Sequence, residues 1–398
     1  MKSIVTPLVV YLVTTAIVFA GLHFGARLLK PCTHGAHIFD PEAGAYANWD
    51  GQWYSEIASR GYSNEVGNTT SVAFFPGYPL AGRLVKRVTG LPIDLALILV
   101  SNGFFLGSLW LMTRYIRMRV PGHELDARTE GYTLLTLAVI PSSFFFRVAY
   151  SESMFLFITI LTLTAMERRW PLVAIAALIG LATAIRPVGI ALIPALLLHA
   201  WSISDTTRRK AINIAISAPI AIWGLELYSV YLYYEFGDPL AFSNAQVAWN
   251  RHGLVSPINK VLDLFALEPI LSIFNPSSVA YWYHHDPHHS LLFSLRLYDA
   301  GFFLLAFGLT ALGAIRGWLS VREILTSVCL LLVPYCTNGY STYMNSMGRY
   351  STVAVPIYLV LARGLRSLPE AWASAMVGVS GFFLGAYAAL FAAWYVVI

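Results

Sequence analysis

Apolar runs long enough to cross a bilayer recur along the whole 398-residue chain, and they constrain its fold more than any other feature. A bilayer core about 30 Å thick is crossed by roughly 20 apolar residues in a helix. Hydrophobic side chains make up 57% of the chain and charged ones only 12%, whereas soluble proteins carry roughly 25% charged residues. This composition argues against a soluble globular fold and against disorder. The chain is therefore predicted to be an all-α polytopic membrane protein.

The net charge and the cysteines restrict the functional classes further. The formal charge of +5 is an excess of Lys and Arg that positive cytoplasmic loops alone supply, so it does not indicate a nucleic-acid partner. The three cysteines match no zinc spacing and cannot form a disulfide framework. We interpret Cys32, Cys329 and Cys336 as packing residues of helices.

Charged residues, prolines and glycines divide the apolar runs into candidate spans of a single integral membrane domain over residues 1–398. There are eleven, near 4–25, 93–113, 131–149, 152–166, 171–185, 187–201, 211–236, 294–315, 319–337, 351–365 and 371–397. An alternative for the first is a signal peptide cleaved after Ala20, because the residues before Gly21 resemble a small-residue cleavage site.

The distribution of Lys and Arg predicts a cytoplasmic N-terminus. With that orientation the inner segments carry fourteen basic residues and the short outer loops carry three, Arg147, Arg186 and Arg349. Residues 26–92 and 237–293 then form two large extracytoplasmic loops, and all inner loops are short. We expect an extracytoplasmic active site, in the plasma membrane of a prokaryote or the endoplasmic reticulum of a eukaryote.

The first large loop contains an aromatic pattern that predicts a helix. Trp49, Trp53 and Ile57 recur at steps of four, which indicates one face of a helix that lies in the membrane interface. Asp50 falls at its start, where the carboxylate is either a general base at headgroup depth or a helix N-cap. Glu56 and Arg60 are four residues apart and are expected to pair on the solvent face.

Three clusters of charge lie at the predicted outer ends of spans. The turn after residue 146 contains Arg147, Tyr150 and Glu152, the 185–187 turn contains Arg186, and Arg349 precedes the tenth span. Arginine binds phosphate well because its planar fork donates two hydrogen bonds to one oxyanion. We therefore predict a shared phosphate site, the alternative being that each arginine snorkels to the headgroups and anchors its own helix.

The second large loop contains four histidines around one aspartate. Such tracts are able to bind zinc, but adjacent histidines rarely complete one tetrahedral site. We expect no cofactor and interpret the loop as solvated or in contact with headgroups, with a divalent metal as the alternative. The candidate ligands are His284, His285, His288 and His289.

Several short blocks, in order along the chain, resemble the PIG-V family of membrane mannosyltransferases. Their eukaryotic members add the second mannose to glycosylphosphatidylinositol precursors. The resemblance covers the N-terminal half well and the C-terminal half thinly. The matching residues are Trp49-Asp50, Ile57-Ala58, Gly61-Tyr62, the block 73–80, Ala149 to Glu152, Ala182-Thr183 through Arg186 and Gly189, and more weakly Arg349-Tyr350 with Pro356 and Tyr358.

The resemblance implies a GT-C fold with the active site on the outer face, and a sugar donor bound to polyprenyl or dolichyl phosphate. It implies Asp50 as the base that deprotonates a hydroxyl of a lipid or glycolipid acceptor in one inverting step, with mannose as the expected sugar. Outer-face arginines would stabilise the leaving phosphate, Arg186 first, then Arg349 and Arg147. The residues expected to bind or orient acceptor and sugar are Glu152, Trp53, Tyr54, Glu56 and Tyr150.

Two alternatives stay open at this stage. One is a GT-C transferase for another sugar or for a protein acceptor. The other is a transporter or flippase of lipid-linked sugars, which would carry structural repeats and polar residues near the membrane midplane.

Overall fold

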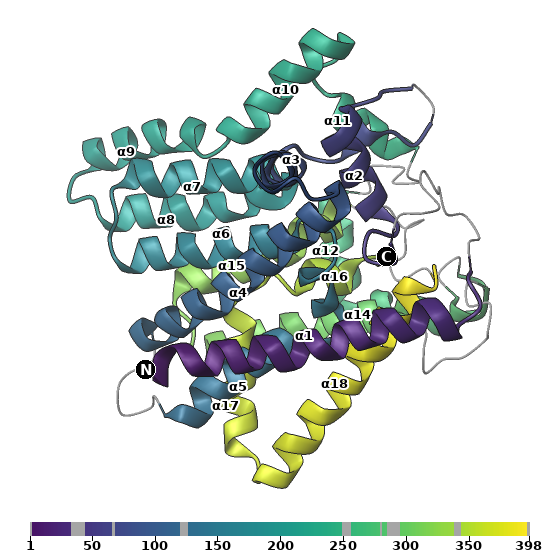
Figure 1. The fold of residues 1–398 in the computed structure, drawn as a ribbon. Coiled ribbons are helices and arrows are strands. Elements are labelled where there is room, and N and C mark those ends of the chain that lie inside the picture. Colours follow the sequence, from purple (N-terminus) through teal and green to yellow (C-terminus); the bar gives the residue numbers. More distant parts are fainter. Residues whose placement is uncertain are drawn as a thin grey trace.

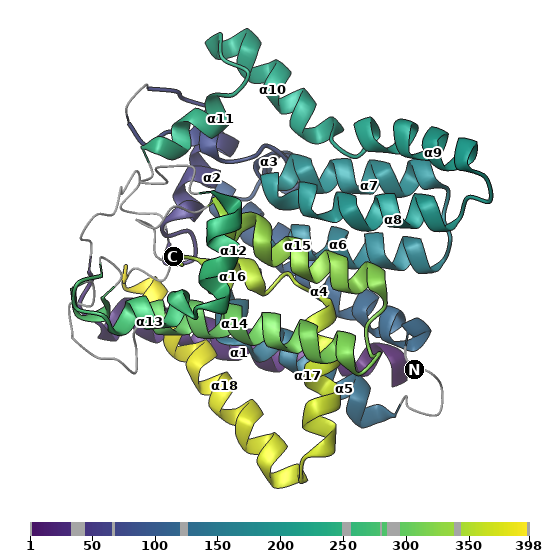
Figure 2. The ribbon, with the colours of Figure 1, turned by 180° about the vertical axis from the view of Figure 1, so that it is seen from behind.

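The computed structural model describes residues 2–32, 44–65, 68–119, 126–248, 256–278, 281–284, 295–337 and 344–395, and within these it contains helices and no strand. Figures 1 and 2 show the helix bundle from opposite sides. Its α-helices are α1 (Lys2–Leu28), α2 (Asp50–Arg60), α3 (Gly77–Thr89), α4 (Ile93–Arg119), α5 (Ala127–Val139), α6 (Glu152–Glu167), α7 (Leu172–Ile185), α8 (Ile193–Ser202), α9 (Thr207–Ile220), α10 (Trp223–Phe236), α11 (Ala241–Asn244), α12 (Pro257–Phe265), α13 (Glu268–Phe274), α14 (Leu295–Ile315), α15 (Val321–Thr337), α16 (Met347–Ser351), α17 (Pro356–Ser367) and α18 (Glu370–Ala392). Short 3-10 helices are η1 (Ser71–Ala73), η2 (Pro141–Phe146), η3 (Pro187–Leu192), η4 (Ala245–Val247) and η5 (Trp282–His284).

Long apolar helices confirm an all-α polytopic membrane fold. Among the described residues, α1, α4, α14 and α18 are long and apolar enough to cross a membrane, and the bent pair α9 and α10 adds a fifth span if the two are counted together. Exposed apolar side chains such as Leu12 and Val13 line α1. Each of the eleven expected spans contains a helix or a pair of helices, but their number as spans stays a prediction.

Prolines interrupt three of the segments that we expected to be continuous. The segment 131–149 is α5 followed by η2 from Pro141, and 187–201 begins with η3 at Pro187 before α8. In the segment 351–365, α16 ends at Ser351 and α17 starts at Pro356. Proline lacks the backbone N–H that a helix interior needs, so each interruption falls where the sequence changes the local hydrogen bonding.

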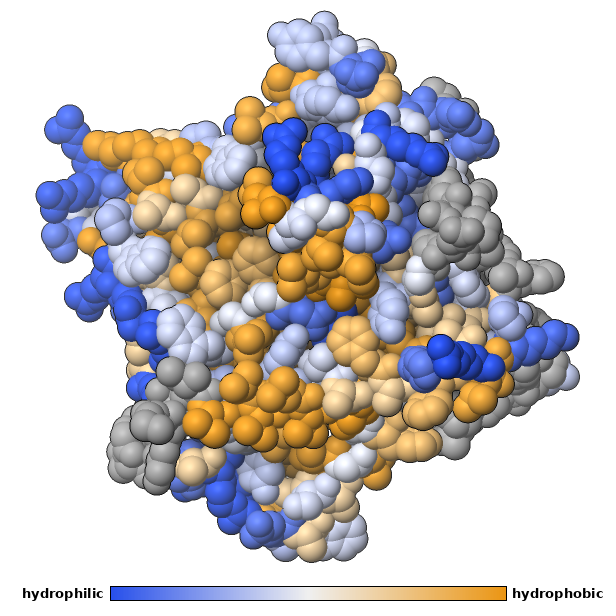
Figure 3. All heavy atoms as spheres, viewed as in Figure 1, coloured by the Kyte–Doolittle hydropathy of each residue, from blue (hydrophilic) through white to orange (hydrophobic). Residues whose placement is uncertain are grey.

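The bundle has two distinct ends. The N-terminus and the connection between α8 and α9 lie at one end, which we call the N-terminal end, and α2, α12 and α16 lie toward the other, the α2 end (Figure 1). Hydrophobic side chains dominate the middle of the face in Figure 3, and hydrophilic ones gather toward its edges. The two large loops supply α2, η1 and α3 and, later in the chain, α11 to α13.

Close packing of α1 against α18 joins the two ends of the chain. A Cβ added to Gly21 would lie 2.3 Å from the carbonyl oxygen of Gly385. A Cβ added to Gly25 would lie 2.2 Å from the carbonyl oxygen of Ala389. Small residues spaced four apart allow membrane helices to approach at backbone distance. This contact fixes the C-terminal end of α18, which in turn holds the segment before α2.

Candidate active site

The turn before α2 is held by hydrogen bonds from two directions. The Asn48 side chain is 1% exposed and donates to two backbone carbonyls at the end of α18 at 3.0 and 3.2 Å. The Tyr150 hydroxyl accepts from the Asp50 N–H at 3.1 Å and donates to the Asn48 carbonyl at 3.2 Å. Trp49 between them has a φ of 57°, in the left-handed region that side chains disfavour. These contacts hold Asp50 at the first position of α2.

The predicted amphipathic helix is confirmed, but its aromatic face packs on protein. Trp53, Tyr54 and Ile57 are each at most 6% exposed, and Trp53 stacks on Phe74 with the ring centroids 5.9 Å apart. At the far end of the helix, the Arg83 guanidinium donates to the carbonyls of Ile57 and Ala58 at 2.8 and 2.9 Å. The expectation of an aromatic face lying in the membrane interface is therefore wrong for Trp53 and Ile57, because α3 and α4 cover this face.

Four charged side chains form one chain of ion pairs at the start of α2. Arg349 Nη1 lies 2.7 Å from Asp50 Oδ2, and Arg349 Nε lies 3.1 Å from Glu152 Oε1. Arg186 Nη1 also pairs with Glu152 Oε1 and donates to Ser151 Oγ at 3.2 Å. We call Asp50, Arg349, Glu152 and Arg186 the ionic cluster.

Burial differs along the ionic cluster. The Glu152 and Arg349 side chains are 1% and 6% exposed, whereas Arg186 is 11% and Asp50 14% exposed. The two positive and two negative charges balance, which is the condition under which buried charges are tolerated. Asp50 and Arg186 are the members most accessible to a ligand, and Glu152 holds both arginines from the inside.

The carboxylates keep the arginines charged. Burial alone would lower the pKa of Arg349, but Asp50 and Glu152 hold it well above its usual range. Burial likewise opposes the charge of Arg186, and Glu152 raises its pKa above the usual range. The cluster therefore presents two permanent guanidinium groups with many N–H donors.

Asp50 is not the N-cap of α2. The N-cap position of α2 is occupied by Trp49 and has no side-chain cap. The Asp50 carboxylate is directed to Arg349 instead, while its position in the first helical turn suits a negative charge.

Two tyrosines pack against the ionic cluster. The Tyr54 hydroxyl lies 2.9 Å from Ser151 Oγ, and the guanidinium carbon of Arg349 lies 5.4 Å from the centre of the Tyr150 ring. Burial raises the pKa of both Tyr54 and Tyr150 above the usual value. Both therefore remain neutral hydroxyls that orient their neighbours.

Asp299 positions Arg349, and we did not predict it. Its carboxylate accepts from the N–H groups of Ser346 and Gly348 at 3.1 and 2.9 Å, which fixes the start of α16. Ser142 adds a hydrogen bond from Oγ to the Gly348 carbonyl at 3.1 Å. The available signal was a carboxylate inside the apolar segment 294–315, because ionisable residues in such segments are costly.

Arg147 does not join the ionic cluster, which corrects our expectation. It is 0% exposed and donates to the hydroxyls of Thr14 and Thr15 and to the backbone carbonyls of Ser143 and Ala138. Its guanidinium carbon lies 4.3 Å over the Phe105 ring. The residue is neither a phosphate ligand of the cluster nor a snorkelling anchor, because its donors bind the interior of the bundle.

Glu56 does not join the ionic cluster, and the side chains of the predicted histidine ligands fall outside the described residues. Glu56 makes no ion pair within the described residues, and burial raises its pKa, with Arg60 opposing. The side chain of His284 and all of His285, His288 and His289 lie outside the described residues. No group of three His, Cys, Asp or Glu side chains able to hold a metal occurs in the part that is described.

The family model for Mannosyltransferase (PIG-V) matches residues 29–283. One relative is GPI alpha-1,6-mannosyltransferase 2 of Cricetulus griseus, which is 30% identical over 186 residues, 44% of this chain and 35% of the relative. The protein of the same name from Rattus norvegicus is 29% identical over 155 residues, 36% of this chain and 30% of the relative. The matched part thus spans about a third of the length of these relatives.

A solved structure resembles the whole bundle. The crystal structure of the Archaeoglobus fulgidus oligosaccharyltransferase, tethered to an acceptor peptide, aligns with a TM-score of 0.50 at 13% identity and covers 98% of this chain and 55% of that chain. At this identity the similarity concerns the fold alone. The fold is that of the GT-C membrane glycosyltransferases.

The fold and the site thus define a helical membrane protein whose ionic cluster lies at the α2 end. Since the family match covers more than half of its length, the chain belongs to the mannosyltransferase (PIG-V) family.

Proposed function

We propose that the protein is an inverting mannosyltransferase that uses a polyprenyl or dolichyl phosphate donor and a lipid or glycolipid acceptor. The observation that carries this proposal is the ionic cluster, in which a partly exposed Asp50 carboxylate lies beside two arginines. A base and a phosphate-binding group within one cluster are the two elements that this transfer needs.

Asp50 acts as the general base. Its Oδ2 is paired with Arg349, so the residue is a carboxylate, and Oδ1 is the oxygen proposed to take the proton. The acceptor oxygen forms the new bond to the anomeric carbon of mannose as its proton passes to Asp50. The bond from that carbon to the phosphate oxygen breaks on the opposite face, so a β-linked donor yields an α-mannoside.

Arg186 and Arg349 stabilise the phosphate as it leaves. Both guanidinium groups are fixed by Glu152 before substrate binds, so no reorganisation is needed when negative charge develops. Glu152 is a positioning residue, because its carboxylate contacts arginines at 1% exposure. Tyr54 and Tyr150 hold the same arrangement through Ser151 and the α2 turn.

An apolar groove supports a lipid-linked donor. A cavity of about 510 Å³ lies between α2, α3, α7 and α10 and is lined largely by apolar and aromatic side chains, among them Ile57, Leu181 and Tyr228. Ala184 also lines it and precedes Arg186 by two residues. A prenyl chain in this groove would carry its phosphate toward the ionic cluster.

The proposed orientation puts this chemistry outside the cytoplasm. The fourteen basic residues that we assign to inner segments and the three outer arginines follow the positive-inside rule with a cytoplasmic N-terminus. The large segments 26–92 and 237–293 would then form the extracytoplasmic loops of one integral membrane domain.

The test incubates purified full-length protein with polyprenyl phosphate mannose and a panel of acceptor lipids. We expect transfer to at least one acceptor, and an α-mannoside by NMR of the product. Glu65→Gln removes an exposed carboxylate from the same loop and should keep wild-type turnover. Retention of the donor's configuration would contradict the inverting step, and scrambling of the donor in liposomes without transfer would favour a transporter.

A further inference from the structure

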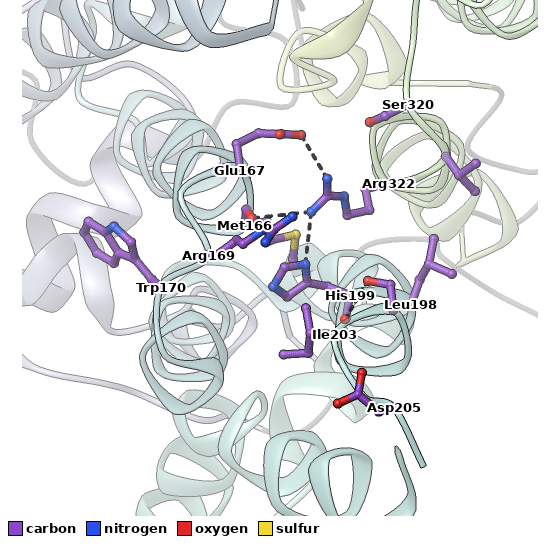
Figure 4. A pocket seen from close by; sticks show the side chains of 12 residues that line it. Met166, Glu167, Arg169, Trp170, Leu198, His199, Ile203, Asp205, Ser320 and Arg322 are labelled. Atoms are coloured by element: carbon purple, nitrogen blue, oxygen red, sulfur yellow. Dashed lines mark hydrogen bonds and ion pairs between the residues drawn. The ribbon is translucent and has the colours of Figure 1, made fainter. Parts of the chain in front are cut away.

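A second cavity lies at the N-terminal end of the bundle, opposite the ionic cluster. It has a volume of about 900 Å³ and forms where α6 and α8 end and α15 begins. Figure 4 shows the lining side chains, with Glu167, Arg322 and His199 linked by hydrogen bonds and ion pairs. Nothing in the proposed transfer reaction uses this cavity.

His199 presents an unpartnered hydrogen-bond donor there. The residue is 1% exposed, and Arg322 Nη1 lies 3.0 Å from its Nδ1. Arginine has only donors, so Nδ1 must accept, and the ring proton of the neutral imidazole is therefore on Nε2. This buried Nε2–H has no hydrogen-bond partner among the described residues. The tautomer excludes a metal at Nε2 and calls for a ligand with an acceptor oxygen.

Two arginines and a helix start surround the same space. Arg169 and Arg322 both line the cavity, and Figure 4 shows their guanidinium groups directed toward the His199 ring. Ser320 and Val321, at the beginning of the 17-residue α15, line it as well. This helix start is already capped, because the Ser320 N–H donates to Glu323 Oε2 at 2.6 Å and the Glu323 N–H donates to Ser320 Oγ at 3.4 Å. The donors left for a ligand are therefore those of the arginines and His199.

The acidic side chains of the lining are already engaged. Glu167 Oε1 pairs with Arg322 Nη2 at 3.1 Å and with Arg119 at 3.9 Å. Asp205 is 84% exposed and pairs with Arg209 at 3.6 Å. Arg169, in contrast, has no ion pair among the described residues. Its charge is the one that remains for a ligand.

The mouth of the cavity is apolar. Trp170, Ile203 and Val321 line it and are 39%, 44% and 62% exposed. The cavity thus has hydrogen-bond donors inside and exposed apolar side chains at its mouth. This arrangement suits a phosphate group that is attached to acyl chains. We infer that this cavity binds a phosphate group, with Arg169, the Arg322 guanidinium and His199 Nε2–H as its donors. An anionic phospholipid headgroup and free phosphate are the two sources of this chemistry.

The test titrates purified full-length protein with two probes. Native mass spectrometry follows binding of phosphatidylglycerol against phosphatidylcholine, and isothermal titration calorimetry follows inorganic phosphate. We expect Arg169→Gln and His199→Phe each to weaken binding of the phosphate-bearing probe by at least about tenfold, the scale of one charge-assisted hydrogen bond. Arg169 is exposed, so its variant tests the site even where replacement of His199 impairs folding.

Arg208→Gln is the matched control, because it removes an exposed arginine at the same end that does not line the cavity. It should leave binding within about twofold of wild type. Preferential binding of phosphatidylglycerol that Arg169→Gln weakens supports a lipid headgroup, and binding of inorganic phosphate alone with the same sensitivity supports a soluble source. The proposal would be overturned if Arg169→Gln bound either probe as well as wild type does, or if neither probe bound. It would also be overturned if the protein bound phosphatidylglycerol no better than phosphatidylcholine and did not bind inorganic phosphate.

Discussion

Arg349 lies 2.7 Å from Asp50, although the two residues are 299 positions apart in the chain. The same guanidinium reaches Glu152 at 3.1 Å, so it connects the partly exposed carboxylate with the buried one. The starts of α2, α6 and α16 meet at this point.

Arg349→Lys tests the bridge while it keeps the positive charge. A lysine ammonium cannot make both directed contacts of the planar guanidinium, so kcat should fall by about 100-fold. Arg60→Lys, at an exposed position of the same helix as Asp50, should remain within about twofold of wild type. Steady-state kinetics with both variants provides the measurement, and wild-type kcat in Arg349→Lys would remove Arg349 from the mechanism.

Gly348→Ala tests how α16 is positioned. The added Cβ would lie 2.5 Å from Asp299 Oδ1 and 2.8 Å from the Tyr298 ring, so we expect a loss of stability of about 1–3 kcal/mol and a clear loss of activity. Gly364→Ala, at an open position of α17, should instead stabilise the protein by about 0.5–1 kcal/mol. Thermal unfolding in detergent compares them, and equal stability of the two variants would contradict the packing.

Gly25→Ala tests the contact between α1 and α18. Its Cβ would meet the Ala389 backbone at 2.2 Å, which separates the helices and disturbs the carbonyls that hold Asn48. The melting temperature and transferase activity should fall together. Gly378→Ala, at an open position of α18, is the control and should lower neither.

Glu56→Gln tests the pH dependence of stability. Burial raises the pKa of Glu56 in the folded protein, so the folded state binds this proton more tightly than the unfolded chain. The corresponding stability is present below the ordinary carboxyl pKa and is lost as the pH rises through the raised value. Melting temperatures of Glu56→Gln should therefore fall less than those of wild type on going from pH 4 to pH 7, and parallel curves would contradict this assignment. Activity at neutral pH should be unchanged, because Glu56 lies outside the ionic cluster.

The sequence allowed much of the α2 end to be predicted. The four-residue spacing of Trp49, Trp53 and Ile57 predicted α2 to within one residue at its start, because helical periodicity is a local property. The predicted topology put Glu152, Arg186 and Arg349 on the same membrane face as Asp50. We therefore predicted that these residues form one site. These residues meet in the structure because they end or begin helices at the same level.

Other features were beyond sequence reasoning for physical reasons. Arg147 stands at the end of an apolar run like the other arginines, but its side chain turns into the bundle toward Thr14, and that direction depends on tertiary packing. Asp299 was missed because its two hydrogen-bond donors come from residues almost fifty positions away. The Pro141, Pro187 and Pro356 interruptions were visible as prolines, but whether a span bends or continues at such a residue depends on its neighbours.

Asp50→Asn provides the most direct measurement of the central claim. Asparagine keeps the size of the side chain but cannot accept the acceptor proton, so single-turnover mannose transfer should fall by at least about 100-fold. The asparagine oxygen can still accept from Arg349, so the protein should fold and bind donor, with the lower melting temperature that follows from loss of one charge of the pair. Donor binding by the folded variant separates loss of the base from loss of fold. A folded Asp50→Asn protein that binds donor and transfers mannose at the wild-type rate would contradict Asp50 as the base.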